Sequence, residues 1–423
     1  MKSRYQSKMS RLIIVFIILF LLDLYAYKGL VSLTNSLTAV WAKTIKITYW
    51  VLSLLVIFQL LNIFSRFREY TTDHPEAFRF WAGIFFVLFF TKLTFITFHL
   101  VDDLVWIFRR VISFFTANNK TFGEKLINRS TFITQIGLGA SALIFGAYSY
   151  GVLKGKYAYK IFKEKIKFPN LPSAFDGLRI VQISDLHLGS FLKDFDEVSE
   201  AIPMINNLHP DIILFTGDLV NVHSDEAEPW IEIFSKLKAK HGKFSVFGNH
   251  DYCDYGSYLP EERVKSINRL KEVHHEMGFQ LLEDEHTFLE IDNQKIAIVG
   301  MHNWGKGFHE IGSLENALEG LDDSHFKILL SHDPTLWEEK VKGKKNIDIT
   351  FSGHTHGMQM GVEIPFLNFK WSPIKLRYKR WAGLYKYAKN YIYINRGFGF
   401  LGFPGRVGIS PEITFIELKS KED

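Results

Sequence analysis

Four long apolar stretches near the N-terminus limit most strongly what this 423-residue chain can fold into. They lie near 12–33, 45–64, 80–100 and 133–152. About 20 mostly apolar residues form a helix long enough to cross the hydrocarbon core of a bilayer. We therefore expect a bundle of four transmembrane helices. A cleaved signal peptide explains the first stretch less well, because no small-residue cleavage site follows it and further apolar stretches do.

Ionisable residues interrupt this apolar region. Asp23 and Lys92 lie within the first and third stretches, where a charge is costly and often marks a path for an ion or substrate. The alternative, which we favour, is a residue near a helix end or packed inside the bundle. The segment Val101–Phe115 is too short for another span and carries four charged residues. It predicts a separate helix at the membrane surface.

The distribution of positive charge indicates which side of the membrane holds the rest of the chain. With four spans and an inner N-terminus, thirteen Lys and Arg residues flank the spans on the inner side and eight on the outer side. This bias favours a multi-pass protein of the bacterial inner membrane with a cytoplasmic C-terminal domain. One segment indicates the opposite: Asn128–Phe132 (NRSTF) resembles a decayed twin-arginine export signal, which would place the domain outside.

The remainder of the chain has the pattern of an α/β domain. Short β-branched runs that end in Gly, Ser or Asp predict buried strands at 178–184, 212–216, 244–247, 296–300, 328–331 and 347–352. Helical stretches such as Glu197–Leu208 and Pro229–Lys238 lie between several of them. Alternating strands and helices predict layered sheets with functional residues beyond the strand ends. We divide the chain into a transmembrane region (1–153), a linker with an edge strand (154–176) and the domain (177–420).

The amino-acid composition excludes several kinds of structural and binding site. Cys253 is the only cysteine, so the chain can form neither an intramolecular disulfide nor a thiolate metal cluster. The formal charge of +5 is too small to argue for a nucleic acid partner. Any metal site must therefore use His, Asp, Glu or Asn.

Five short blocks place oxygen or imidazole donors directly after predicted strands. They begin at Ser184, Gly217, Gly248, Ser331 and Gly353. Asp185 and His187 are two residues apart, as are His354 and His356. In an extended loop the two side chains of each pair would point to the same side of the backbone and could bind one ion. Imidazoles and hard oxygens suit Mn, Fe or Zn. The candidate ligands are Asp185, His187, Asp218, Asn249, His332, His354 and His356.

Charge indicates what such a site would attract. Two divalent ions, two aspartates and a hydroxide leave a net positive charge, which favours a phosphate group. Ions bridged by Asp218 would activate a shared hydroxide for attack on a phosphoester. His250 would protonate the leaving oxygen, and Asp251 would orient a neighbouring imidazole. The alternative requires five unrelated loops to carry Gly, Asp and His at strand ends for turn geometry alone, so we favour the metal site.

These blocks resemble, in order and one by one, the motifs of the calcineurin-like metallophosphoesterases. The resemblance covers about 176–418, and the flanking residues are similar to a membrane-associated bacterial subgroup. It implies a four-layered α/β/β/α sandwich with two divalent ions, Mn favoured over Fe or Zn. The first ion would take Asp185, His187 and His356, and the second Asn249, His332 and His354, with Asp218 bridging them.

The subgroup usually has Gly-Gly-Gln after the last His, whereas here Met358 stands between Gly357 and Gln359. A larger side chain at this position would reshape the rim of the pocket, which puts the transfer of a substrate from relatives in doubt. Four residues remain candidates for contacts with the ligands or the substrate: Asp251, His302, Gln359 and Arg396.

The segment Pro365–Leu384 interleaves aromatic residues with Lys and Arg, a pattern typical of lipid headgroup contact. An ordinary solvated loop explains the pattern equally well. With the membrane region, the segment indicates an amphiphilic phosphodiester or pyrophosphate, such as a phospholipid, an undecaprenyl-linked sugar or a lipid A precursor. Resemblance to enzymes that cleave UDP-diacylglucosamine makes that pyrophosphate one candidate.

Two functions of different classes remain. The first is a membrane-anchored two-metal phosphoesterase, with a phosphodiester favoured over a monoester. The second is a membrane sensor or scaffold whose metal domain binds phosphorylated ligands with little turnover. The pair Asn249 and His250 favours the first, because a binding module needs no proton donor. A transporter gated by the domain rests only on Asp23 and Lys92, and no protein partner is implied.

Overall fold

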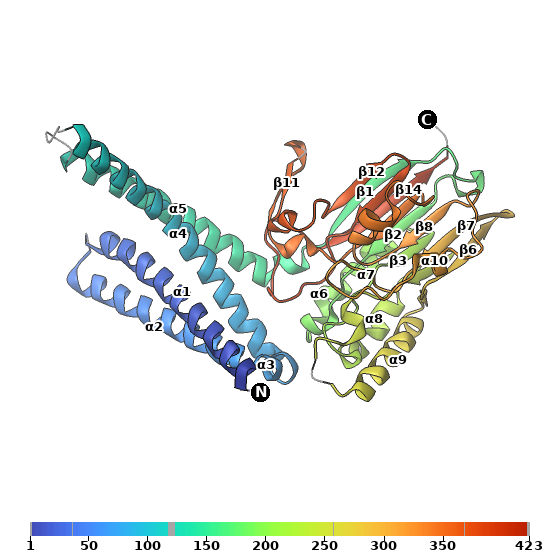
Figure 1. Ribbon diagram of the computed structural model, residues 1–423, viewed down its shortest axis with the longest axis horizontal. Helices are drawn as coiled ribbons and strands as arrows, with labels where there is room; N and C mark the ends of the chain where they lie inside the picture. The colour runs from blue at the N-terminus through green and yellow to red at the C-terminus, as the bar shows by residue number, and fades with distance from the viewer. Residues whose placement is uncertain (1, 36, 117–122, 257, 368, 421–423) are drawn as a thin grey trace. The chain divides into compact units, whose positions relative to one another are not determined.

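The computed structural model describes residues 2–35, 37–116, 123–256, 258–367 and 369–420 (Figure 1). The chain divides into two compact units, of which the first ends at Leu153 and the second begins at Lys154. The described part of the first unit is helical, and the second unit is built on two β-sheets.

Five helices make up the described part of the first unit. They are α1 (Lys2–Thr34), α2 (Ala39–Ser65), α3 (Phe67–Thr72), α4 (Pro75–Thr116) and α5 (Gly123–Leu153). Four stretches are long and apolar enough to cross a membrane: Ile13–Thr34, Ala39–Ser65, Pro75–Phe115 and Phe132–Leu153. The expectation of four spans is confirmed. The side chains of 128–131, in the segment that resembles an export signal, lie outside the described residues.

The third span corrects one expectation. Val101–Phe115 does not form a separate surface helix but continues α4, which Figure 1 shows as one uninterrupted rod. No Pro or Gly occurs between Gly83 and Thr116, so nothing in this sequence ends the helix. At 1.5 Å per residue the 42 residues of α4 extend about 63 Å, roughly twice the hydrocarbon core of a bilayer. At ordinary tilts, part of α4 therefore lies beyond the hydrocarbon.

Asp23 and Lys92 form an ion pair inside the helical unit. Lys92 Nζ lies 2.5 Å from Asp23 Oδ1 and 2.8 Å from Ser53 Oγ. The Tyr49 hydroxyl donates to Asp23 Oδ1 at 3.1 Å, and Asp23 is buried. An apolar cavity of about 30 Å³ adjoins the pair. The pair thus joins α1, α2 and α4, which agrees with packing inside the bundle.

Removing one partner of this pair is expected to destabilise the helical unit. In Lys92→Met the Asp23 carboxylate stays buried without its cation, a change that costs about 3–5 kcal/mol in soluble proteins. The double variant Asp23→Leu/Lys92→Met should recover most of this loss, because no charge remains buried. Thermal unfolding of the detergent-purified protein compares the variants. A double variant no more stable than Lys92→Met would contradict the ion-pair explanation.

Two six-stranded sheets form the centre of the second unit. In spatial order, the first sheet contains β1 (Lys160–Lys167), β14 (Glu412–Lys419), β2 (Arg179–Ile183), β3 (Ile212–Phe215), β4 (Gly242–Ser245) and β5 (Gln280–Leu281). The second contains β12 (Gly383–Tyr387), β13 (Asn390–Ile394), β9 (Ile349–Ser352), β8 (Lys327–Leu330), β7 (Gln294–Gly300) and β6 (Glu285–Ile291). A separate hairpin joins β10 (Val362–Ile364) and β11 (Phe369–Trp371).

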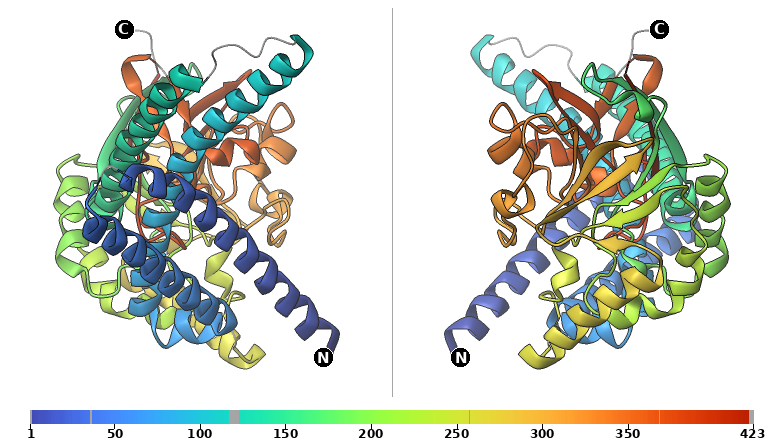
Figure 2. Two further views of the ribbon diagram at one scale, coloured as in Figure 1. Left: turned by 90° about the vertical axis from the view of Figure 1, so that its left-hand side faces the viewer. Right: turned by 90° about the vertical axis from the view of Figure 1, so that its right-hand side faces the viewer.

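Helices flank the sheets. Their bounds are α6 (Phe195–Ser199), α7 (Ala201–Asn206), α8 (Ile231–Ser235), α9 (Pro260–Glu276) and α10 (Leu314–Ala317). Figures 1 and 2 show α6 to α9, light green to yellow, together on one side of the domain. The helix expected over Glu197–Leu208 is thus two short helices, whereas each of the six predicted strands overlaps an observed one.

Alternate side chains of one strand enter different cores. In β3, Phe215 packs in a core that includes Phe234 of α8. Leu214, the preceding residue, belongs to another core that includes Leu330 of the second sheet. Successive side chains of a strand point to opposite faces of a sheet. The first sheet is therefore covered by helices on one face and by the second sheet on the other.

The second sheet repeats this arrangement in mirror order. Leu330 of β8 faces the core between the sheets, while Leu329 packs with Leu314 of α10 and with Trp337. The order of layers is helix, sheet, sheet, helix. The expected four-layered α/β/β/α sandwich is confirmed.

Candidate metal centre

The loops after β2, β3, β4, β8 and β9 carry the seven candidate ligands. β2, β3 and β4 are parallel neighbours in the first sheet, and β8 and β9 are parallel neighbours in the second. The carboxyl ends of parallel neighbours lie at one edge of a sheet, where the following loops meet. This topology brings residues that are far apart in the sequence to one place.

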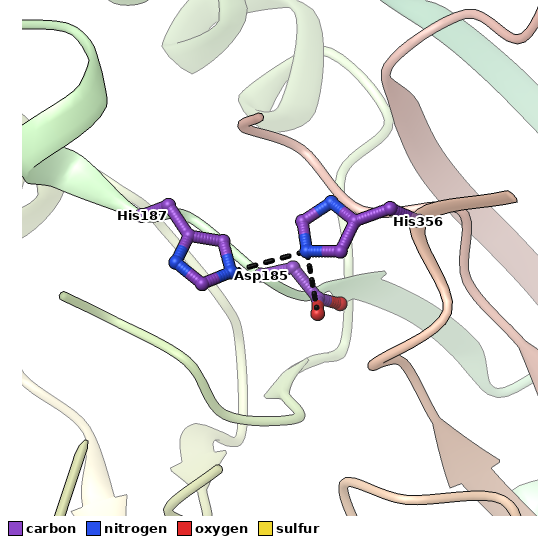
Figure 3. A group of neighbouring side chains, drawn as sticks. All are labelled: Asp185, His187 and His356. Carbon is purple, nitrogen blue, oxygen red and sulfur yellow. Dashed lines mark hydrogen bonds and ion pairs between the residues drawn. The ribbon is translucent and has the colours of Figure 1, made fainter. Parts of the chain in front are cut away.

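Asp185, His187 and His356 form the first ligand group (Figure 3). His187 Nε2 lies 3.0 Å from His356 Nε2, which lies 3.2 Å from Asp185 Oδ1. All three residues are buried. Two ligand atoms about 2.1 Å from one ion and at right angles lie about 3.0 Å apart. The three side chains therefore have the spacing that a single ion requires.

Asp218, His332 and His354 form the second group. His332 Nε2 lies 3.0 Å from Asp218 Oδ2 and 3.2 Å from His354 Nδ1. The other ring nitrogen of His332, Nδ1, donates to the carbonyl of Thr216 at 2.7 Å. Because a carbonyl only accepts hydrogen bonds, Nδ1 carries the hydrogen and Nε2 is left to face the group.

Asp218 of the second group also approaches the first group. Its Oδ2 is 3.0 Å from His332 Nε2 and 3.5 Å from His187 Nε2. Its Oδ1 accepts the backbone N–H of His250 at 2.8 Å. One carboxylate oxygen thus approaches an imidazole of each group, which is the position that a bridging carboxylate needs.

Asn249 presents an oxygen that needs a partner. Its Oδ1 is buried and accepts no hydrogen bond from the described residues, while its Nδ2 donates to the Tyr255 hydroxyl at 2.8 Å. An unsatisfied buried acceptor costs about 1–3 kcal/mol. A bound cation would remove this cost, and the surrounding imidazoles and carboxylates are ligands that Mn, Fe and Zn accept. The residues present therefore fit a divalent metal site.

Burial and charge set the protonation of these side chains. Burial lowers the pKa of His187 to about 3 and that of His354 to about 4, so both imidazoles are neutral, the form that binds metal. Burial also acts on His332, but the Asp218 and Asp185 carboxylates outweigh it and raise its pKa to about 10. Although burial opposes it, His332 holds the pKa of the Asp218 carboxyl well below its usual range. A divalent ion would take the place of the His332 proton.

The backbone at the site corrects the expectation of extended loops. Five of the seven candidate ligands have a left-handed backbone: Asp185 (φ 54°), His187 (φ 46°), Asp218 (φ 60°), His354 (φ 69°) and His356 (φ 50°). This conformation costs about 1–2 kcal/mol per residue with a side chain. His354 and His356 also do not share one group, although their spacing suggested it. Strain is therefore concentrated where the ligands converge.

Two glycines allow the loops to approach the carboxylates closely. A Cβ atom at Gly248 would lie 2.2 Å from Asp218 Oδ1, and one at Gly353 would lie 2.3 Å from Asp185 Oδ2. Both distances are far below contact distance. The Gly that begins each of these two blocks is therefore required by packing against a ligand.

His250 lies beside the ligand groups without belonging to either. Its Nδ1 lies 2.7 Å from the carbonyl of Asn221, so Nδ1 carries a hydrogen and donates it. Its ring stacks on Tyr255 with centroids 4.2 Å apart and meets His187 edge-on at 4.9 Å. These contacts fix the ring through Nδ1, so Nε2 is the nitrogen that can take up and release a second proton.

Asp251 does not orient an imidazole as expected. Its carboxylate accepts the backbone N–H groups of Asp218, Leu219 and Gly248 at 2.8–2.9 Å. These amides belong to the loops after β3 and β4, which lie next to each other. Asp251 therefore holds the two loops together and fixes Asp218 through its backbone.

The other three candidates bond elsewhere. Gln359 donates to the carbonyls of Phe403 and Gly405 and accepts from the amide of Leu401. Arg396 pairs with Glu363 at 2.7 Å and Glu412 at 2.6 Å. The His302 imidazole contacts Tyr252 at 2.9 Å and Glu283 at 3.7 Å. None of these contacts joins a residue of the two ligand groups, and contact of the three side chains with a substrate stays a prediction.

Sequence reasoning missed three residues at the site. Tyr255 holds both Asn249 and His250, as described above. The Tyr378 hydroxyl lies 2.9 Å from His354 Nε2, and Arg406 Nη2 lies 3.5 Å from His356 Nδ1. Tyr378 lies in the aromatic and basic segment that we considered for lipid contact. Arg406 lies in a Gly-rich loop, and no pattern marks it.

Comparisons with known proteins agree with this geometry. The family model "Calcineurin-like phosphoesterase" matches residues 178–358, and "Probable Calcineurin-like phosphoesterase, transmembrane domain" matches residues 9–156. The uncharacterized metallophosphoesterase YkuE of Bacillus subtilis is 31% identical over 302 residues, which are 70% of this chain and 99% of that protein. The chain belongs to the calcineurin-like metallophosphoesterase family. This family supports a metal-dependent phosphoester hydrolase, here one integral to a membrane.

The names of two further relatives mention a membrane or a substrate with acyl chains. A transmembrane protein with metallophosphoesterase domain of Danio rerio is 27% identical over 282 residues, 64% of this chain and 60% of that protein. The UDP-2,3-diacylglucosamine pyrophosphatase LpxG of Chlamydia muridarum is 29% identical over 279 residues, 54% of this chain and 81% of that protein. Metallophosphoesterases bind divalent ions, and the two ligand groups are the candidate residues for holding them.

Divalent ions are expected to raise the melting temperature of this metallophosphoesterase. A ligand that binds only the folded state stabilises it by about 2.7 kcal/mol when the free ligand concentration is 100 times the dissociation constant. Differential scanning fluorimetry of chelator-stripped protein, with and without Mn²⁺, measures the rise. Asp218→Asn should reduce it, whereas the control Asp225→Asn, whose side chain is 83% exposed, should keep it. A melting temperature that no divalent ion changes would contradict the assignment of the ligands.

Proposed function

We propose that this metallophosphoesterase is a membrane-anchored two-metal enzyme that hydrolyses a phosphodiester or pyrophosphate, including one carried by a lipid. The position of Asp218 Oδ2 supports it most directly, because this oxygen approaches an imidazole of each ligand group. Asp185, His187 and His356 would hold one divalent ion, and Asn249, His332 and His354 would hold the other, with Asp218 available to both. Mn is favoured over Fe or Zn.

The chemistry divides between the ions and the protein. Two divalent ions would lower the pKa of a water and offset the charge on the phosphoryl oxygens. His250 gives a proton from Nε2 to the leaving oxygen when both ring nitrogens are protonated, and the ring becomes neutral with its hydrogen on Nδ1. The Asn221 carbonyl accepts Nδ1–H throughout and keeps the ring in place. Asp251 binds two backbone amides in the loop of Asp218 and the amide of Gly248 in the neighbouring loop, which fixes Asp218 in place.

Two observations support a lipid-linked substrate. Four spans precede the catalytic domain, and the relative LpxG acts on UDP-2,3-diacylglucosamine, a pyrophosphate that carries acyl chains. The same relative supports a pyrophosphate or diester over a monoester. The excess of positive charge on the inner flanks supports a cytoplasmic catalytic domain. The competing function, a sensor that binds phosphorylated ligands, leaves the placement of His250 without a purpose.

Substrate comparison tests the proposal. Full-length protein in detergent with Mn²⁺ is assayed on p-nitrophenyl phosphate, bis-p-nitrophenyl phosphate and UDP-2,3-diacylglucosamine. We expect the diester and the pyrophosphate to be cleaved faster than the monoester. Preference for the monoester, or turnover that persists in excess chelator, would overturn the proposal.

A further inference from the structure

One surface of the catalytic domain exposes large apolar side chains next to cations. It is formed by the β10–β11 hairpin and the residues that follow it, and Figure 1 shows this hairpin projecting from the domain. Phe366 is 87% exposed, Leu367 62% and Leu376 91%. Lys375, Arg377 and Lys379 are also exposed and flank Leu376 in the sequence. We call these six residues the hairpin patch.

The sequence that forms the hairpin patch and its flanks is rich in basic residues, although Glu338 pairs with Arg380 there. The 48 residues between Glu363 and Glu412 contain nine Lys and Arg and no Asp or Glu. Glu363 itself is paired with Arg396. Aromatic and aliphatic tips bordered by Lys and Arg match the boundary between acyl chains and anionic headgroups. An exposed apolar surface of this kind marks an interaction site rather than ordinary solvent contact.

A bilayer lies within reach of the catalytic domain. The chain crosses the membrane up to Leu153, and β1 begins at Lys160. The six residues between them extend at most about 25 Å. The catalytic domain is therefore tethered at the membrane, where anionic lipid is present at high local concentration.

The hairpin patch also connects to the second ligand group. Arg377 lies over the ring of Phe308 at 4.8 Å, and this ring meets the imidazole of His354 edge-on at 4.5 Å. The next residue, Tyr378, places its hydroxyl 2.9 Å from His354 Nε2. Residues of one short segment thus reach both the exposed patch and a metal ligand.

We propose that the hairpin patch inserts into the headgroup layer of an anionic bilayer and holds the metal centre at the bilayer surface. Phe366, Leu367 and Leu376 enter the acyl boundary, and Lys375, Arg377 and Lys379 contact lipid phosphates. A lipid-linked phosphate then reaches His354 without leaving the membrane. This last consequence rests on the proposed function, whereas the insertion does not.

Site-specific fluorescence tests the insertion. Full-length Phe366→Cys in nanodiscs is labelled with an environment-sensitive dye, and the native Cys253 stays unlabelled because it is 1% exposed. The control is Glu232→Cys in α8, whose side chain is 86% exposed and which lies far from the hairpin (Figure 1). A lipid-borne quencher should reduce the fluorescence of the dye at Phe366→Cys several-fold more than that of the dye at the control position. This quenching should increase when the nanodisc contains phosphatidylglycerol and decrease at high salt. Equal quenching at both positions, or no effect of phosphatidylglycerol, would overturn the proposal.

A substrate comparison tests the consequence. The variant Phe366→Ser/Leu367→Ser/Leu376→Ser removes exposed side chains only, so turnover of water-soluble bis-p-nitrophenyl phosphate should stay within about twofold, whereas turnover of a lipid-embedded phosphodiester should fall about tenfold. Equal turnover of the embedded substrate by the variant and the natural protein would overturn this role. Failure of the proposed function gives a different result, namely no turnover of either substrate by the natural protein, while the fluorescence experiment still reports insertion.

Discussion

Asp218→Asn is expected to lower metal-dependent turnover of bis-p-nitrophenyl phosphate by at least about a thousandfold, or about 4 kcal/mol. The amide keeps the shape of the carboxylate, and its oxygen can still accept the N–H of His250, now 2.8 Å from Asp218 Oδ1. It loses the negative charge that approaches both ligand groups. The variant should therefore lose its shared metal ligand and keep its fold.

The fold of this variant can be checked independently. Although burial opposes it, the Asp218 charge contributes most to the raised pKa of His332, so the substitution also favours the neutral form of this imidazole. Circular dichroism of the stripped variant should match that of the natural protein. Asp225→Asn is the control, because it makes the same change on an exposed side chain. Turnover by Asp218→Asn within about tenfold of the natural protein would show that this carboxylate bridges nothing.

His250→Ala is expected to show a loss that depends on the leaving group. General acid catalysis contributes about 10²–10⁴-fold when the departing oxygen needs a proton. An alkyl phosphodiester should therefore lose at least about a hundredfold, whereas p-nitrophenolate leaves unprotonated and its ester should lose little. The measurement is kcat/KM across phosphodiesters whose leaving groups differ in pKa.

Tyr255→Phe provides the matched control for His250. It keeps the ring that stacks on His250 but removes the hydroxyl that holds Asn249 Nδ2. This substitution should weaken metal binding and change kcat/KM by the same factor for all leaving groups. If His250→Ala loses the same factor on good and poor leaving groups, His250 is not the proton donor.

The membrane region illustrates what apolar pattern can and cannot predict. Four long apolar runs were enough to predict four spans, because lipid accepts little else. The apolar pattern failed to predict that the helix continues past Val101, where the charged residues Asp102 and Asp103 follow. Charges were taken to end the span, but α4 continues through them, because no Pro occurs there to break the helix. Asp103, for example, forms an ion pair with Lys28, whose Nζ lies 2.8 Å from Asp103 Oδ2.

The candidate site was predictable in composition and not in geometry. Donors after parallel strands had to meet, since topology places those strand ends together. The division of His354 and His356 between groups depends on backbone conformation, which a spacing of two residues does not specify. Partners of Asp251, Gln359 and Arg396 depend on tertiary contacts that no local pattern encodes. Tyr255 and Arg406 were missed for the same reason.

The most direct test of the two-metal assignment is to titrate chelator-stripped, full-length protein with Mn²⁺ while measuring bound ions per chain and turnover of bis-p-nitrophenyl phosphate on the same samples. We predict that turnover appears as the second ion binds and that Asp218→Asn binds fewer ions without turnover. Two ions bound per chain with no hydrolysis of this ester or of a lipid-linked phosphate would contradict the enzyme and favour a sensor.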